Sequence, residues 1–176
     1  MNPLQKEKLT KWILPILAAG LLILAGLSLF NRPGVHQVYV LLPNGQTILA
    51  DVADSPEEQL VGLFFAESLP EDRGLLLIYE EAGPHRLWTR NIRFSIDMIW
   101  LDPSRQIIQV DENVPPCTKD PCPSYGPSDR AALFALEVAA GVAQQHGLLT
   151  GVSLEFRRTP SEKSPLPGTD ASSPET

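Results

Sequence analysis

The sequence predicts a mainly β protein: a single compact β-sandwich or barrel-like domain with one or two short helices, preceded by one transmembrane helix. Seven short apolar runs follow one another between turn residues, which is typical of all-β domains. They lack the regular alternation of strand and helix that accompanies a parallel sheet. A long uncharged segment before these runs predicts the membrane helix.

The apolar runs are read as strands because they are short, rich in β-branched and aromatic residues, and bounded by turn residues. The first two flank Pro43-Asn44-Gly45, and Asn-Gly between apolar runs predicts a hairpin. The sequence Asp102-Pro103-Ser104-Arg105 predicts a turn between the fourth and fifth strands. The predicted strands span residues 35–42, 46–53, 73–80, 94–101, 106–112, 132–138 and 152–156.

Two helices are expected between the strands. The first covers about 55–65, because Ser55 suits the N-cap, Pro56 the first helical position and Glu58 the third, which together form a capping box. Its apolar stripe holds Leu60, Val61 and Phe64. The second covers about 139–146, and Gly147 suits the position that follows the helix end.

Residues 12–30 contain no charged side chain and would span about 28 Å as a helix, close to the thickness of a bilayer's hydrocarbon core. Three lysines precede the segment and Arg32 follows it. The excess of positive charge before the segment predicts a single-pass protein of the cytoplasmic membrane, with its N-terminus inside and its domain outside. A cleaved signal peptide is the main alternative, but the run is long for one and lacks an A-x-A-like site. A buried soluble helix is a further alternative.

The remaining chain divides by composition. Residues 1–11 form a basic cytoplasmic N-terminus, 31–34 a linker, 35–157 the folded domain, and 158–176 a Pro/Ser/Thr-rich tail expected to be disordered. The formal net charge is −7, and after residue 34 there are 20 acidic against 10 basic residues. An acidic domain of this kind argues against a nucleic-acid partner.

Cys117 and Cys122 lie in a segment that holds five prolines between positions 115 and 127. In an exported domain we expect them to form a disulfide that holds this loop in one shape. A redox pair would normally show C-x-x-C spacing, and a zinc site would need further ligands at motif spacing. If the domain were cytoplasmic, free thiols would be the default.

Two carboxylates stand out because they interrupt apolar strands: Asp97 in residues 94–101 and Glu137 in residues 132–138. Buried carboxylates need partners, either backbone N–H groups or the nearby arginines at 86, 90 and 93. One interpretation is structural. The other is a ligand site formed by Trp88, Arg90, Asn91, Asp97 and Glu137.

Catalytic sequence motifs such as G-x-S-x-G, the P-loop, H-E-x-x-H and G-x-G-x-x-G are missing, and no metal or cofactor is expected. We therefore expect a non-enzymatic binding or envelope-associated module, whose partners are the bilayer through residues 12–30 and an envelope ligand or protein. The alternative is a hydrolase of an envelope or carbohydrate polymer, with Asp97 and Glu137 as paired carboxylates.

Four stretches resemble the bacterial and archaeal family called domain of unknown function 192: residues 62–81, 87–102, 112–127 and 135–141. The family pattern reads G-L-M-x-R, G-M-L-F, F-W-M-K-N-T, P-L-D-I and L-E-x-x-A-G. The matching residues here are Gly62-Leu63, Gly74-Leu75, Trp88, Asn91, Asp97, Leu136-Glu137 and Gly141. The resemblance implies a compact β-rich fold, often secreted or membrane-tethered, and no established activity.

The chain also departs from that pattern. Phe64 replaces methionine, Ala66 replaces arginine, and Thr89-Arg90 replaces Met-Lys. Ile92 replaces threonine and Ser95 replaces proline. If these positions belong to a ligand site, the site has changed in this chain.

Overall fold

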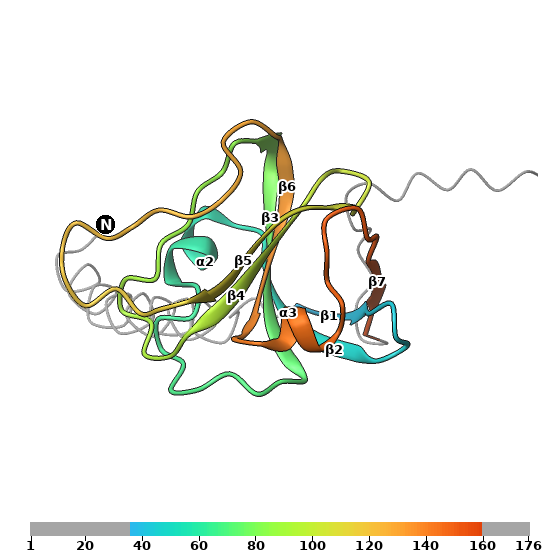
Figure 1. Ribbon diagram of the computed structural model, residues 1–176, viewed down its shortest axis with the longest axis horizontal. Coiled ribbons are helices and arrows are strands. Elements are labelled where there is room, and N and C mark those ends of the chain that lie inside the picture. Colours follow the sequence, from blue (N-terminus) through green and yellow to red (C-terminus); the bar gives the residue numbers. More distant parts are fainter. Residues whose placement is uncertain (1–35, 160–176) are drawn as a thin grey trace, which may run out of the picture. The chain divides into compact units, whose positions relative to one another are not determined.

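The computed structural model describes residues 36–159, and their fold is mainly β, as expected. One sheet contains seven strands in the order β5-β4-β6-β3-β2-β1-β7, accompanied by two short helices (Figure 1). The strands are β1 Gln37–Leu41, β2 Thr47–Ala53, β3 Arg73–Gly83, β4 Ile96–Leu101, β5 Ile107–Val114, β6 Ala132–Ala139 and β7 Glu155–Arg158. The helices are α2 Pro56–Val61 and α3 Val142–Gln145.

All seven predicted strands are present, with shifted ends. The hairpin prediction is confirmed, because β1 and β2 pair antiparallel around the 43–45 turn and Gly45 has a φ of 82°. The turn at 102–105 is confirmed too, since the N–H of Arg105 donates to the carbonyl of Asp102 at 2.9 Å. β7 extends to Arg158, so the folded part ends slightly later than predicted.

Two parts of the predicted architecture need correction. The strands belong to one sheet, so a two-sheet sandwich is not formed. In addition, β2 and β3 are parallel and joined through α2, although the sequence had suggested no strand–helix–strand unit. A parallel pair requires a crossover connection, and the segment 54–72 supplies it. All other strand pairs are antiparallel.

The two edge strands of the sheet, β5 and β7, are linked at one corner through the segments that precede them. The segment before β7 pairs with the start of β5 through a bridge between Gln106 and Ser153. There the N–H of Ile107 donates to the carbonyl of Val152 at 2.7 Å, and the N–H of Leu154 donates to the carbonyl of Arg105 at 3.1 Å. The first of these hydrogen bonds satisfies a backbone N–H of β5 that a free edge would leave unpaired.

Both faces of the sheet bury apolar side chains. The larger cluster includes Val40, Leu76, Ile99 and Phe134, and α3 packs into it. The smaller cluster lies on the opposite face and includes Leu77, Met98 and Trp100. Burial on both faces explains why β3, β4 and β6 read as nearly continuous apolar runs rather than as alternating ones.

The capping box is confirmed: the N–H of Glu58 donates to the Ser55 hydroxyl, and the Glu58 carboxylate accepts from the N–H of Ser55. The helix ends at Val61, four residues earlier than predicted, because Gly62 has a left-handed φ of 46°. Its predicted apolar stripe is not buried, and Leu60 is 84% exposed. In the second helix, Gly147 follows the C-cap with a φ of 65°, as expected.

Among residues 36–159, no helix is long and apolar enough to cross a membrane. The predicted basic N-terminus at 1–11, membrane helix at 12–30 and linker at 31–34 lie outside the described residues. So does the predicted tail after Thr159.

Candidate functional site

Glu137 lies in the middle of the sheet and faces a pocket. It belongs to β6, where it pairs with Leu75 of β3 on one side and with Met98 of β4 on the other. Only 4% of the residue is exposed. Because successive side chains of a strand point to opposite faces, the register places Glu137 on the face of the smaller apolar cluster.

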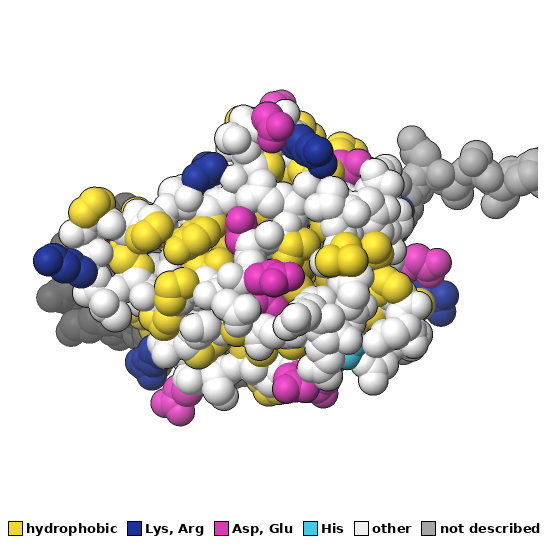
Figure 2. Space-filling view, viewed as in Figure 1, with side chains coloured by type: hydrophobic (Ala, Val, Ile, Leu, Met, Phe, Trp, Pro, Cys, Tyr) yellow, Lys and Arg dark blue, Asp and Glu magenta, His cyan; other side chains and the backbone are white. Residues whose placement is uncertain are grey.

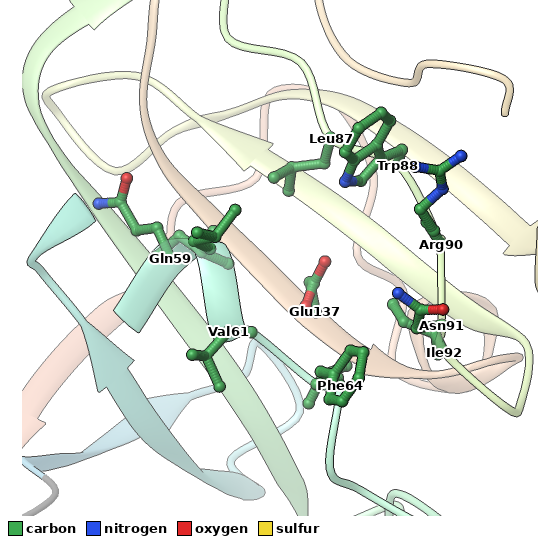
Figure 3. Close-up of a pocket in the computed structure, with 13 residues that line it drawn as sticks. Gln59, Val61, Phe64, Leu87, Trp88, Arg90, Asn91, Ile92 and Glu137 are labelled. Carbon is green, nitrogen blue, oxygen red and sulfur yellow. The ribbon is translucent and has the colours of Figure 1, made fainter. Parts of the chain in front are cut away.

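A pocket of about 320 Å³ opens above this carboxylate. One wall is α2 and the turn after it, the other is the segment 87–92, and Leu77 contributes to the floor. In the close-up, the Glu137 carboxylate stands between the Trp88 side and the Phe64 side (Figure 3). The lining consists of Gln59, Leu60, Val61, Gly62, Leu63, Phe64, Leu77, Leu87, Trp88, Arg90, Asn91, Ile92 and Glu137.

The Glu137 carboxylate accepts no hydrogen bond and forms no ion pair with any residue that the structure describes. Burial without a partner disfavours its charged form and raises the pKa of Glu137 to about 7. On the same face, the hydroxyl of Tyr79 is buried and has no partner among the described residues. Burial, and secondly the charge of Glu137, raise the pKa of Tyr79 above its usual value. Glu137 in the pocket and Tyr79 beside it on the same face are therefore two polar groups without a partner among the described residues.

Helix α2 is fixed over the sheet by a polar contact rather than by its apolar stripe. The Gln59 amide donates to the carbonyl of Ile78 at 2.8 Å and to that of Ala53 at 3.4 Å. This contact turns Leu60, Val61 and Phe64 toward solvent and the pocket, where they are exposed. Apolar side chains gather around the position of α2 in the space-filling view (Figure 2).

The opposite wall is braced by the disulfide loop. The predicted Cys117–Cys122 bond is present. The N–H of Cys117 donates to the carbonyl of Thr89 at 3.2 Å, and the Thr89 hydroxyl donates to the carbonyl of Pro115 at 2.8 Å. Within the loop, Asp120 pairs with Arg90, whose guanidinium carbon lies 5.3 Å from the Trp88 ring centroid. The loop thus fixes both Arg90 and Trp88 at the pocket mouth.

Removing the disulfide should loosen this wall. Replacing both Cys117 and Cys122 by serine frees a short loop, which by the chain-entropy relation costs about 2 kcal/mol of unfolding free energy. Urea unfolding of the full chain in detergent would measure the loss, and reduction of the wild type should reproduce it. Equal stability of oxidised and reduced protein would contradict the bracing role.

Asp97 is buried but does not belong to the pocket. Its carboxylate accepts three backbone N–H groups: Asn113 at 2.8 Å, Gly141 at 2.9 Å and Ala143 at 2.9 Å. Gly141 is the N-cap of α3 and has no side chain to cap the helix, so Asp97 supplies that acceptor from a neighbouring strand. Its role in this structure is to join β4, β5 and α3.

The paired-carboxylate arrangement that the hydrolase alternative requires is not formed. Asp97 pairs with Val138, the residue after Glu137, so the two carboxylates project from opposite faces of the sheet. Asp97 is 0% exposed and cannot meet a substrate in the same cleft. Of the five predicted ligand residues, the structure brings Trp88, Arg90, Asn91 and Glu137 together and excludes Asp97.

The expected arginine partners of the two carboxylates are not used. Arg86 donates to the carbonyls of Ser124 and Gly126 and to the Ser124 hydroxyl. Arg90 pairs with Asp120, and Arg93 lies 3.9 Å from Glu67. The arginines stabilise loops, while backbone N–H groups satisfy Asp97.

Sequence analysis missed the pocket wall from α2, namely Gln59, Leu60 and the turn through Phe64. The available signal was a capped helix followed by a glycine and two phenylalanines, which is unusual for a helix meant to bury its stripe. Among the described residues, no group of three His, Cys, Asp or Glu side chains is arranged to hold a metal ion.

Fold and site together define a class: a mainly β domain in which a curled mixed sheet carries a half-open pocket around one buried carboxylate. A model of the family DUF192, described as uncharacterized ACR, matches residues 39–156. The chain belongs to this family, as its motifs had indicated.

The family motifs now have a place in the structure. Gly62, Leu63, Trp88, Asn91 and Glu137 all line the pocket. Two further motif residues, Asp97 and Gly141, are joined by a hydrogen bond from the Gly141 N–H to the Asp97 carboxylate. Three of the departures from the motif pattern, at positions 64, 90 and 92, also line the pocket. The other three departures, at positions 66, 89 and 95, are not part of the lining.

Two solved structures share the fold. One is from Sinorhizobium meliloti and is described as a candidate transcription regulator; it is 24% identical, with a TM-score of 0.59, and the match covers 69% of this chain and 92% of that one. The other is a protein of unknown function from Novosphingobium aromaticivorans, 22% identical, with a TM-score of 0.59 and coverage of 70% and 89%. No curated protein sequence matches the chain significantly.

Proposed function

We propose that the protein is a membrane-anchored domain on the outer side of the cytoplasmic membrane, and that it binds a small ligand in the pocket around Glu137. The observation that carries the binding function is the unpartnered, almost fully buried carboxylate that faces an apolar pocket. A buried charge without a partner destabilises a protein, so its place is best explained by a partner that arrives from outside.

The pocket composition favours binding over hydrolysis. Glu137 is the sole carboxylate among the described lining residues, and that lining contains no Ser, Cys, His or Tyr side chain. A hydrolase of the paired-carboxylate type would need a second carboxylate within about 5–10 Å across the cleft. The volume of about 320 Å³ lies at the small end of ligand pockets.

The anchoring and the location rest on the sequence and on the disulfide. Residues 12–30 form an uncharged run preceded by three lysines, which favours an N-terminus inside the cell. The Cys117–Cys122 bond supports an oxidising compartment, because disulfides persist mainly outside the cytoplasm.

Binding can be tested on the full chain in detergent by thermal unfolding against a panel of small aromatic and aliphatic fragments. We expect one chemical class to raise the unfolding temperature, since a ligand at about 100 times its Kd adds roughly 2.7 kcal/mol. Val61→Trp should abolish the shift by filling the pocket, whereas Leu149→Trp, at an exposed site outside it, should not. If no fragment shifts the wild type, or the shifts persist in Val61→Trp, the pocket is not a binding site.

Localisation has a separate test. In bacterial cells that express the full chain, we expect the protein in the membrane fraction after carbonate washing, and protease added to spheroplasts should digest the domain. A variant that lacks residues 12–30 should move to the soluble fraction. Protection of the domain in spheroplasts would overturn the proposed orientation.

A further inference from the structure

The unsatisfied carboxylate at the base of an apolar pocket defines what the ligand must carry. Glu137 is 4% exposed and can offer two oxygens to a donor that enters from the mouth. Eight of the lining residues are aliphatic or aromatic, so the rest of the ligand must be apolar. These are Leu60, Val61, Leu63, Phe64, Leu77, Leu87, Trp88 and Ile92.

We propose that the pocket binds a small primary amine in its ammonium form, with the ammonium on Glu137 and an apolar stem between α2 and the segment 87–92. This inference rests on the proposed binding function and names the ligand class. A neutral donor such as an alcohol would give the carboxylate a hydrogen bond but would leave its charge uncompensated. An ammonium supplies both, through a charge-assisted hydrogen bond.

The surroundings of Glu137 are suited to a cation. Trp88 is 54% exposed at the mouth, and indole faces attract ammonium groups. Arg90 is the basic residue among the lining side chains, but Asp120 compensates its charge. The Asn91 amide also lines the pocket and offers a neutral acceptor for a remaining ammonium hydrogen. The acidic net charge of −7 favours the approach of cations over anions.

An ammonium ligand also predicts a direction for the pH dependence. Tyr79 on β3 interacts with the charge of Glu137, and Arg90 on the segment 87–92 lines the same pocket. The β4 neighbour Met98 and the α2 residue Gln59 do not titrate. Because Glu137 has a pKa of about 7, roughly half of the free protein must release a proton at pH 7 before an ammonium binds. Binding should therefore release protons and strengthen as the pH rises from 6 to 8.

The test compares three molecules with the same stem: 2-phenylethylamine, 2-phenylethanol and phenylacetate. Isothermal titration calorimetry on the full chain in detergent, at pH 6, 7 and 8 and in two buffers of different ionisation enthalpy, gives both Kd and the number of protons released. We expect the amine to bind at least tenfold tighter than the alcohol, with phenylacetate weakest. We also expect the Kd of the amine to fall severalfold between pH 6 and pH 8.

Two variants separate the carboxylate from the rest of the site. Glu137→Gln should weaken amine binding at least tenfold and leave binding of the alcohol within threefold. It should also abolish the pH dependence of amine binding. If the pH dependence remained in this variant, it would come from another group, such as His85, which stacks on Tyr79. Glu112→Gln, at an exposed acidic residue, should change nothing. Equal or tighter binding of alcohol or phenylacetate, or proton uptake with the amine, would overturn the ligand class. If other fragments bind in the pocket and amines do not, the proposed binding function is supported and the amine ligand class is wrong. If no fragment binds, both proposals are wrong.

Discussion

Replacing Asp97 by alanine is expected to destabilise the domain strongly. Three backbone N–H groups would lose their acceptor: that of Ala143, which is fully buried, and those of Asn113 and Gly141, which are partly buried. An unsatisfied buried donor costs about 1–3 kcal/mol, so we expect a loss of about 3–5 kcal/mol in unfolding free energy. Urea unfolding of the full chain in detergent would measure it.

Asp97→Asn keeps the measurement possible if the alanine variant does not fold. Asparagine retains one acceptor oxygen, but its NH2 group would face one of the three N–H donors, so we expect a smaller loss of about 2 kcal/mol. Asp129→Asn, at an exposed acidic residue, serves as the matched control and should have little effect. Wild-type stability of Asp97→Ala would show that the three N–H groups find other partners.

The strands were predictable because their signals are local. Asn44-Gly45 specifies a tight turn by itself, and the capping box at Ser55 and Glu58 needs residues that lie three positions apart. The disulfide was predictable for a similar reason, since its two cysteines are separated by a short proline-rich loop. The composition of such segments constrains their shape before any tertiary contact forms.

The strand order and the orientation of the two carboxylates depend on distant pairing. β6 inserts between β3 and β4, and no local signal indicates that β2 and β3 run parallel. Because the central strands are apolar on both faces, alternation cannot show which side of the sheet Asp97 or Glu137 occupies. A shift of one residue in the β4–β6 register would pair Asp97 with Glu137 and place both carboxylates on the same face of the sheet. The register alone therefore separates the structural carboxylate from the pocket carboxylate.

The α2 wall was missed for a related reason. An amphipathic pattern normally predicts that the apolar stripe faces the core. Here the two hydrogen bonds of Gln59 to strand carbonyls fix the helix with its polar side inward, which leaves Phe64 and its neighbours to line the pocket. Gln59 is partly buried in place of the apolar stripe, and exposing that stripe forgoes the stability that its burial would give, which supports the ligand pocket proposed above.

The same cost should be measurable at Glu137, and it gives a pH dependence whose direction can be worked out. The pKa is about 7 in the folded protein and near 4.5 in the unfolded chain. The folded state therefore binds a proton more tightly, so its stability relative to the unfolded state is highest below pH 4.5 and falls as the pH rises to 7. The full difference corresponds to about 3 kcal/mol, reached above pH 7.

Glu137→Gln removes the titrating group while keeping the size of the side chain. We expect this variant to show a flatter stability profile between pH 4.5 and 7 and to be more stable than the wild type by about 3 kcal/mol at pH 8, with little difference at pH 5. Urea unfolding at both pH values measures this, and Glu112→Gln should follow the wild type. Such a gain would mean that the charged carboxylate is kept at a cost to the fold, as expected of a group that serves a ligand rather than the core. Parallel profiles for wild type and Glu137→Gln would instead show that a partner satisfies the carboxylate within the protein, and the argument for an external ligand would lose its basis.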